Sequence, residues 1–144
     1  SYAYTRSIRE YAEGYVPGDY DQPHTLTVLG AFRLKRRWIA SMRFRLGSGQ
    51  PYTPTYGAWS PVDGSWYPID GALNSARHRL YHQLDLRLDR TLLRERWRLN
   101  IYLDLQNVYL ARNPIVELPN WNYTGAGSRI WIPLVPTFGM KGEF

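Results

Sequence analysis

Hydrophobic and polar residues alternate one by one over two neighbouring stretches of the chain. Residues 83–90 have the sequence QLDLRLDR and residues 98–106 have the sequence RLNIYLDLQ. Successive side chains of a β-strand point to opposite faces, so each stretch predicts a strand with one apolar and one polar face. A short charged segment at 92–96 separates them. We therefore predict a β-hairpin.

The expected register of this hairpin sets apolar residues opposite one another. If Arg90 lies opposite Trp97, Leu88 faces Leu99 and Asp89 faces Arg98. The parity of the register is fixed, because a shift by one residue would turn the polar side chains onto the apolar face. Pairs of this kind stabilise a sheet by about 0.2–1 kcal/mol each.

A second hairpin is predicted earlier in the chain. Residues 25–34 and 38–46 alternate in the same way around a basic turn at 35–37, although Leu29 and Ile39 interrupt the polar face. Further strands are expected in segments 1–12 and 129–144 and, less regularly, near 115–123.

Long and short connections alternate along the chain. The connections at 35–37 and 92–96 are short, whereas those at 13–23, 47–80 and 107–128 are long. The longest is the richest in proline and glycine, with nine of these residues, and the last includes a Gly-Ala-Gly sequence at 125–127 that suits a turn. Connections of this length in a compact domain are often functional.

Short turns at one end of a sheet and long loops at the other are typical of outer-membrane β-barrels. We expect an all-β antiparallel meander of about six to eight strands, part of such a barrel. A soluble β-sandwich has the same alternation, but successive charges on the polar face favour a water-filled lumen. The polar side chains expected to face it are Arg43, Arg45, Asp85, Arg87, Asp89, Asn100, Tyr102 and Asp104.

Tryptophan and tyrosine dominate the aromatic residues, with 6 Trp and 12 Tyr against 4 Phe. Both side chains combine an apolar ring with a polar group, which suits a membrane interface or a carbohydrate-binding surface. Five of them lie in or near the longest loop and are the best candidates for binding a ligand from outside. They are Tyr52, Tyr56, Trp59, Trp66 and Tyr67.

Charge and motifs narrow the possible functions. The net charge is +6, but the basic residues form no long run, so we expect no nucleic-acid partner. The absence of cysteine excludes disulfides and thiolate metal sites. His24, His78 and His82 are expected to be polar loop and strand residues, not metal ligands. No nucleophile motif or phosphate-binding loop is present, so we expect neither an enzyme nor a cofactor.

An ordered set of motifs resembles the carboxy-terminal barrel segment of TonB-dependent receptors, over nearly the whole chain. The motifs are SGQPYTP from Ser48, DGSWYPIDGALNSAR from Asp63, YHQLDLRLDR from Tyr81, YLDLQNVYLARNP from Tyr102 and IPLVPTFGMKGEF from Ile132.

The resemblance implies a receptor in the outer membrane of a Gram-negative bacterium that takes up an iron chelate, cobalamin or a glycan. Such receptors enclose a plug domain in a barrel of about 22 strands, and TonB contacts an amino-terminal box. Residues 1–144 contain neither plug nor box. We therefore expect them to form the barrel segment alone, with TonB engaged only through an amino-terminal part missing from this sequence.

The last residues resemble the signal by which the barrel assembly machinery recognises its substrates. Phe138, Met140 and Phe144 share one face of the final predicted strand. Membrane lipid and this machinery are thus the expected partners. Two alternatives stay open: a small self-contained outer-membrane barrel, and a soluble glycan-binding β-sandwich that buries its leucines between two sheets.

Overall fold

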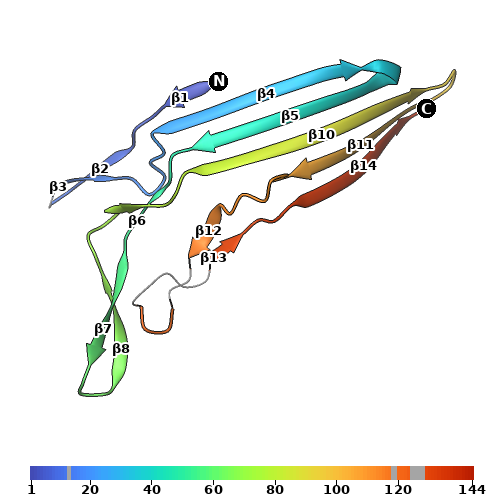
Figure 1. The fold of residues 1–144 in the computed structure, drawn as a ribbon. Helices are drawn as coiled ribbons and strands as arrows, with labels where there is room; N and C mark the ends of the chain where they lie inside the picture. The colour runs from blue at the N-terminus through green and yellow to red at the C-terminus, as the bar shows by residue number, and fades with distance from the viewer. Residues whose placement is uncertain (13, 118–119, 124–128) are drawn as a thin grey trace.

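The computed structural model describes residues 1–12, 14–117, 120–123 and 129–144, and these residues form an all-β structure (Figure 1). Its main element is a six-stranded antiparallel sheet. In spatial order the strands are β1 (Tyr2–Tyr4), β4 (His24–Leu34), β5 (Trp38–Gly47), β10 (Tyr81–Leu93), β11 (Arg98–Gln106) and β14 (Val135–Glu143). This confirms the predicted all-β antiparallel meander.

Four small two-stranded sheets occupy the long connections, all toward one end of the main sheet (Figure 1). They pair β2 (Ile8–Tyr11) with β3 (Gly14–Pro17), β6 (Pro51–Tyr52) with β9 (Ala76–Arg77), β7 (Thr55–Ser60) with β8 (Ser65–Asp70), and β12 (Pro114–Glu117) with β13 (Arg129–Trp131). The two short turns lie at the opposite end, so the expected asymmetry of loops is present.

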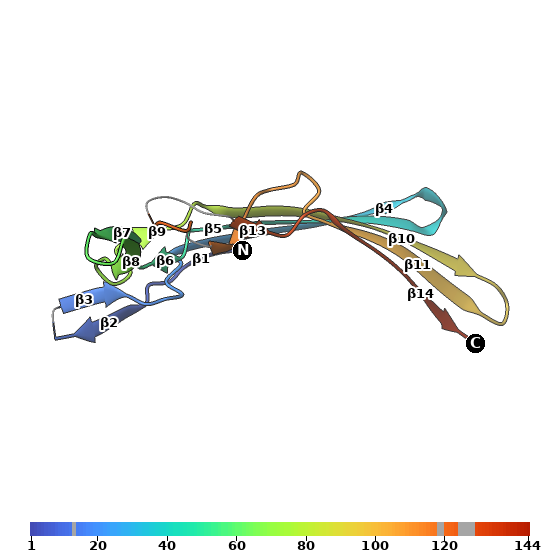
Figure 2. The same ribbon diagram turned by 90° about the horizontal axis from the view of Figure 1, so that it is seen from below.

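The main sheet is a single curved layer, seen edge-on in Figure 2. In the described part of the chain, no second sheet or helix packs on it, and Ala111 is the only buried hydrophobic residue. Leu88 is 36% exposed and Leu103 is 41% exposed. A β-sandwich would bury these leucines between two sheets, so the described residues do not form one.

The strand register places the apolar residues in continuous rows on one face. Phe32, Ala40, Leu88, Leu103 and Phe138 lie opposite one another across five neighbouring strands. The row beside it belongs to the other face and consists of Ala31, Ser41, Arg87, Asp104 and Thr137. The period of two in the sequence therefore becomes two chemically distinct faces.

The turn of the first long hairpin lies where it was predicted. It is a 3-10 turn, η1 (Lys35–Arg37), joining β4 to β5. Arg36 and Arg37 have φ values of 60° and 62°, in the left-handed region that few residues other than glycine adopt.

The predicted register of the β10–β11 hairpin is wrong by four residues, although its parity is correct. Arg90 lies opposite Ile101 instead of Trp97, because β10 extends to Leu93, beyond its predicted end at Arg90, and only residues 94–97 form the turn. The Arg94 amide donates a hydrogen bond of 2.9 Å to the Trp97 carbonyl and closes it. Consequently Arg87 pairs with Asp104 and Asp89 with Tyr102.

Three other predicted strands have different bounds. Segment 1–12 divides into β1 and β2, and segment 129–144 divides into β13 and β14 around Pro133, which has no amide hydrogen to donate. The strand expected near 115–123 is β12, which ends at Glu117, and residues 120–123 form a turn. The expected turn at 125–127 lies outside the described residues.

The described residues contain no helix that is long and apolar enough to cross a membrane.

Candidate ligand-binding site at the long-loop end

The β7–β8 hairpin projects beyond the end of the main sheet (Figure 1). It carries two tryptophans near its tip. Trp59 and Trp66 are direct cross-strand partners, so their side chains lie on the same face of the hairpin. Their ring centres are 5.6 Å apart and the ring planes are inclined by 57°. Gly64, with a φ of 65°, allows the tight turn between the two strands.

A third tryptophan completes this site from a different loop. Trp121, in the connection between β12 and β13, borders the same hollow as Trp59 and Trp66, together with Gly64 and Ser65. We call these five residues the tryptophan hollow. Trp121 is 80% exposed, so its ring is available to a ligand and does not serve as core packing.

Gly57 allows the two loops to approach each other. A Cβ atom at this position would overlap the backbone carbonyl oxygen of Asn122 and press on the ring of Trp66. Glycine therefore permits a close contact between β7 and the neighbouring loop. This contact holds Trp121 beside the hairpin.

The structure brings together only two of the five predicted ligand-binding residues. Trp59 and Trp66 share the tryptophan hollow, whereas Tyr56 and Tyr67 alternate with them and point to the other face of the hairpin. Tyr52 lies farther back, in β6, where its ring stacks on His78 with 4.4 Å between centres.

Tyr67 has a local structural role on its side of the hairpin. Its hydroxyl donates a hydrogen bond to Asp63. This bond lowers the pKa of the Asp63 carboxyl below its ordinary value, with a smaller contribution from Ser60, and it raises the pKa of Tyr67. Tyr67 thus ties the strand to the tip of the hairpin.

Trp121 was missed from the sequence because it lies 55 residues after Trp66, outside the longest loop. Periodicity relates residues within one element and carries no information on which two loops meet. The available signal was Gly57, a residue without a side chain in an otherwise strand-forming segment, which often marks a close backbone approach.

A buried ionic cluster fixes the base of the long loops. Asp21 accepts hydrogen bonds from the Ser7 amide at 2.7 Å and from the Arg77 guanidinium. Arg77 also donates to the Asp21 and Gly49 carbonyls at 2.8 and 3.1 Å. Burial raises the pKa of Asp21, but the hydrogen bonds and the charge of Arg77 outweigh it, so the net shift is downward.

Asn74 extends the cluster. Its side-chain amide donates to the Pro17 carbonyl at 2.9 Å and to Asp19 at 2.8 Å. Segments 5–23, 48–53 and 74–77 are thereby joined around polar atoms instead of an apolar core.

The polar face of the main sheet contains a second charged network. Asp85, only 3% exposed, accepts hydrogen bonds from Arg43 at 2.8 and 3.0 Å, from Gln83 at 2.6 Å and from the Asn107 amide at 3.0 Å. Arg45 approaches the same carboxylate at 3.4 Å.

The network continues along β10. Arg87 binds Asp89 through two hydrogen bonds of 2.8 Å, and its Cζ lies 4.1 Å from the centre of the Tyr102 ring. All eight residues predicted for the polar face lie on this face. The carboxylates of Asp85 and Asp89 are thus engaged by arginines, and Asp89 pairs with Arg87 instead of the predicted Arg98.

The histidines contact tyrosines. His24 stacks on Tyr2, and His82 stacks on Tyr109 and hydrogen-bonds its hydroxyl at 2.9 Å. Across the described ranges, no group of three or more potential metal ligands occurs.

The tryptophan hollow combines apolar ring faces with neutral hydrogen-bonding groups. Its described lining has no ionisable side chain, only three indoles, the Ser65 hydroxyl and Gly64. Exposed indole faces pack against the apolar C–H faces of a sugar ring, and indole N–H groups donate hydrogen bonds to hydroxyl oxygens. The chemistry therefore suits a neutral saccharide.

Comparison with protein-family models, with curated proteins and with solved structures finds no match for this chain.

Proposed function

We propose that this chain is the barrel portion of an outer-membrane receptor of the TonB-dependent type, with a ligand site on its long loops. The observation that carries the proposal is the single-layered sheet. One of its faces is apolar over five long strands and is still exposed to its surroundings. An exposed apolar surface of this extent marks a contact with a partner or a membrane, and in transmembrane barrels such a face contacts lipid.

The opposite face supports the same proposal. It is polar, and its charged side chains form ion pairs: Arg43 pairs with Asp85, and Arg87 pairs with Asp89. A water-filled lumen suits such a surface, because alternating strands in these barrels turn their polar side chains inward. Long loops at one end and short turns at the other correspond to the outer and periplasmic ends of a barrel.

The strand count favours a share in a larger barrel over a small closed one. The main sheet has six strands, of which β1 spans three residues, and β1 and β14 lie at opposite edges (Figure 1). Small barrels filled by side chains have about eight strands. The two free edges suit pairing with further strands of the receptor.

The tryptophan hollow favours a glycan among the ligand classes of such receptors. An iron chelate or a cobalamin carries charged or metal-bound groups, whereas this hollow offers only neutral partners. Its place at the tip of β7–β8, away from the sheet, also separates it from the aromatic residues that border the apolar face.

Expression behind a secretion leader in a Gram-negative host tests the proposal. We expect the chain to fractionate with the outer membrane when it is produced together with the remaining strands of a receptor barrel, and to migrate faster before heating than after heating on a denaturing gel. The matched control is Leu88→Asp, which places a charge on the apolar face and should abolish membrane recovery.

Other outcomes separate the alternatives. A heat-modifiable band from this chain alone would replace the receptor proposal with a small self-contained barrel. A monodisperse, water-soluble chain retained by a glycan matrix would overturn the membrane proposal and favour the soluble module.

A further inference from the structure

The two short turns form a second hollow, at the end of the sheet opposite the tryptophan hollow. Arg36 and Arg37 from η1 and Arg94 and Trp97 from the β10–β11 turn line it. Thr91, Leu92 and Leu93 at the end of β10 also line it. We call it the arginine hollow.

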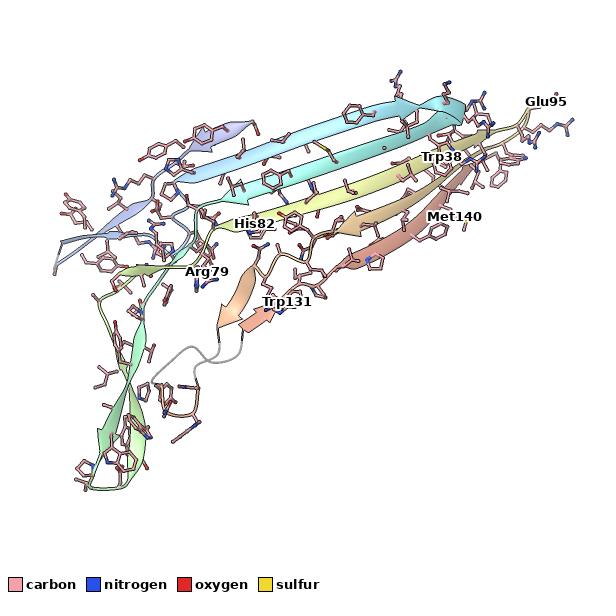
Figure 3. All side chains as sticks on the ribbon, in the orientation of Figure 1. Trp38, Arg79, His82, Glu95, Trp131 and Met140 are labelled. Atoms are coloured by element: carbon pink, nitrogen blue, oxygen red, sulfur yellow. The ribbon has the colours of Figure 1, made fainter. Side chains whose placement is uncertain are left out.

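The positive charges of this hollow are not neutralised by the protein. In the part of the chain that the structure describes, no carboxylate forms an ion pair with Arg36, Arg37 or Arg94. Glu95 belongs to the same turn but does not line the hollow, and Figure 3 shows it at the outer tip. Three arginines around one hollow therefore favour an anion.

Two other basic residues near this end of the sheet have acidic partners. Lys141 lies 2.9 Å from Glu143, and Arg98 lies 3.8 Å from the same carboxylate. Arg33, Lys35 and Arg96 at the same end also form no ion pair within the described residues, so the hollow is distinguished by gathering three arginines around one space.

The backbone of η1 supports a functional role for these arginines. Arg36 and Arg37 both adopt the left-handed conformation, which costs a residue with a side chain about 1–2 kcal/mol. Glycine or asparagine would occupy these positions more easily. Strain of this kind is retained where the surrounding structure uses it, often at binding sites.

The hollow lies where the apolar face of the sheet ends. Trp38 and Arg90, which are register partners on that face, stand next to the turns, with Arg90 Cζ 5.0 Å from the centre of the Trp38 ring. Figure 3 places Trp38 at this end of the sheet. Tryptophan beside arginine is typical of the headgroup level of a membrane.

We propose that the arginine hollow binds the phosphate of an anionic lipid headgroup at the membrane surface facing the short turns. Guanidinium groups pair with phosphate oxygens through two parallel hydrogen bonds, and Trp97 packs beside the glycerol and upper acyl region. The inference rests on the proposed membrane orientation and adds a lipid-binding site to it.

Native mass spectrometry of the full chain in a non-ionic detergent tests this binding without requiring membrane insertion. The probes are phosphatidylglycerol, phosphatidylcholine and inorganic phosphate, whose adducts differ in mass. We expect the wild-type chain to retain phosphatidylglycerol in preference to both other probes. Each arginine should contribute about fivefold to this affinity.

The variant Arg36→Gln, Arg37→Gln, Arg94→Gln should lose most of the preference. A matched control removes the same number of charges elsewhere, through Arg6→Gln, Arg79→Gln and Arg96→Gln, of which Arg96 belongs to the same turn but not to the hollow. This control should bind phosphatidylglycerol like the wild type. Single variants Arg37→Gln and Arg94→Gln keep the test valid if the triple variant fails to fold.

Equal loss in the two triple variants would overturn the site, because binding would then depend on net charge alone. Equal retention of inorganic phosphate and phosphatidylglycerol would overturn the lipid assignment. A chain recovered as a soluble protein that still binds phosphatidylglycerol at the hollow would contradict the proposed function but keep this site.

Discussion

At the residue scale, two glycines permit contacts that any side chain would prevent. Gly57 admits the carbonyl of Asn122 beside the tryptophan hollow, and Gly139 admits the Tyr102 ring on the polar face. Both sit in strands, where glycine weakens the element and is retained for close approach. Their effects are testable with one added methyl group each.

Gly57→Ala should separate the β7–β8 hairpin from the loop that carries Trp121. Loss of one aromatic wall should weaken binding of a neutral polysaccharide about three- to tenfold, because Trp59 and Trp66 keep their pairing while Trp121 moves away. Affinity electrophoresis through gels that contain dextran or starch measures this change. Ser65→Ala is the control, because it removes a hydroxyl group from the same hollow and leaves the three tryptophans unchanged. Unchanged mobility shifts in Gly57→Ala would contradict the assigned role of Trp121.

Gly139→Ala should destabilise the β11–β14 pair. The added methyl group overlaps the Tyr102 ring, which would have to leave its position over Arg87. Overpacking of this kind costs about 1–3 kcal/mol. Gly142→Ala is the matched control on the same strand, because its methyl group would meet only the Phe144 ring at ordinary contact distance. Urea unfolding midpoints in detergent should fall for the first variant and stay close to the wild type for the second.

At the element scale, the sequence determines the faces of the strands but not their offsets. Alternation placed Leu88 and Leu103 on one face and Arg87 and Asp104 on the other, because a shift by one residue would turn charged side chains onto the apolar face. A shift by four residues preserves this parity, so only the hydrogen bond that closes the 94–97 turn settles the register. In a charged segment without glycine or proline, the sequence predicts the geometry of the turn less well than alternation predicts the faces of the strands.

The ionic cluster at Asp21 makes the long loops sensitive to acid. The pKa of Asp21 is lower in the folded protein than in the unfolded chain. Its contribution to stability is therefore complete above the unfolded value and is lost as the pH falls through the folded value. We expect segments 5–23 and 74–77 to become accessible to an acid-active protease below about pH 4, while the strands of the main sheet stay protected.

Asp21→Asn should make the same segments accessible already at neutral pH and remove most of the pH dependence. Asp63→Asn is the control, since that carboxylate also has a lowered pKa but lies in the β7–β8 hairpin, away from the cluster. Cleavage in the loops that follows the same pH profile in the wild type and in Asp21→Asn would assign the acid sensitivity to another group.

At the scale of the whole molecule, the candidate site forms where loops from distant parts of the chain come into contact. The alternation of apolar and polar residues does not show which loops do so. The aromatic composition indicated a membrane interface or a carbohydrate-binding surface. Trp59, Trp66 and Trp121 border one hollow, however, only because two long connections leave the same end of the sheet. The arginine hollow arises in the same way at the other end, from two turns that are distant in sequence and adjacent in the meander. Topology thus creates both hollows.

The chemical difference between the two faces leads to a prediction for the whole sheet. The chain has no cysteine, so single cysteines can carry a nitroxide spin label at chosen positions. We choose Leu88 and Leu103 in one row of the sheet and Arg87 and Asp104 in the next. In lipid bilayers, labels at the leucine positions should collide often with oxygen and rarely with a water-soluble nickel chelate, because oxygen concentrates in the acyl phase.

Labels at positions 87 and 104 should show the opposite preference, since a water-filled lumen admits the chelate. The comparison separates lipid exposure from burial, because a label enclosed between two protein layers collides rarely with both reagents. Low collision rates at 88 and 103 for oxygen and nickel alike would mean that protein covers the apolar face. High nickel rates at all four positions would mean that neither face meets lipid, and the alternation would then need a different partner.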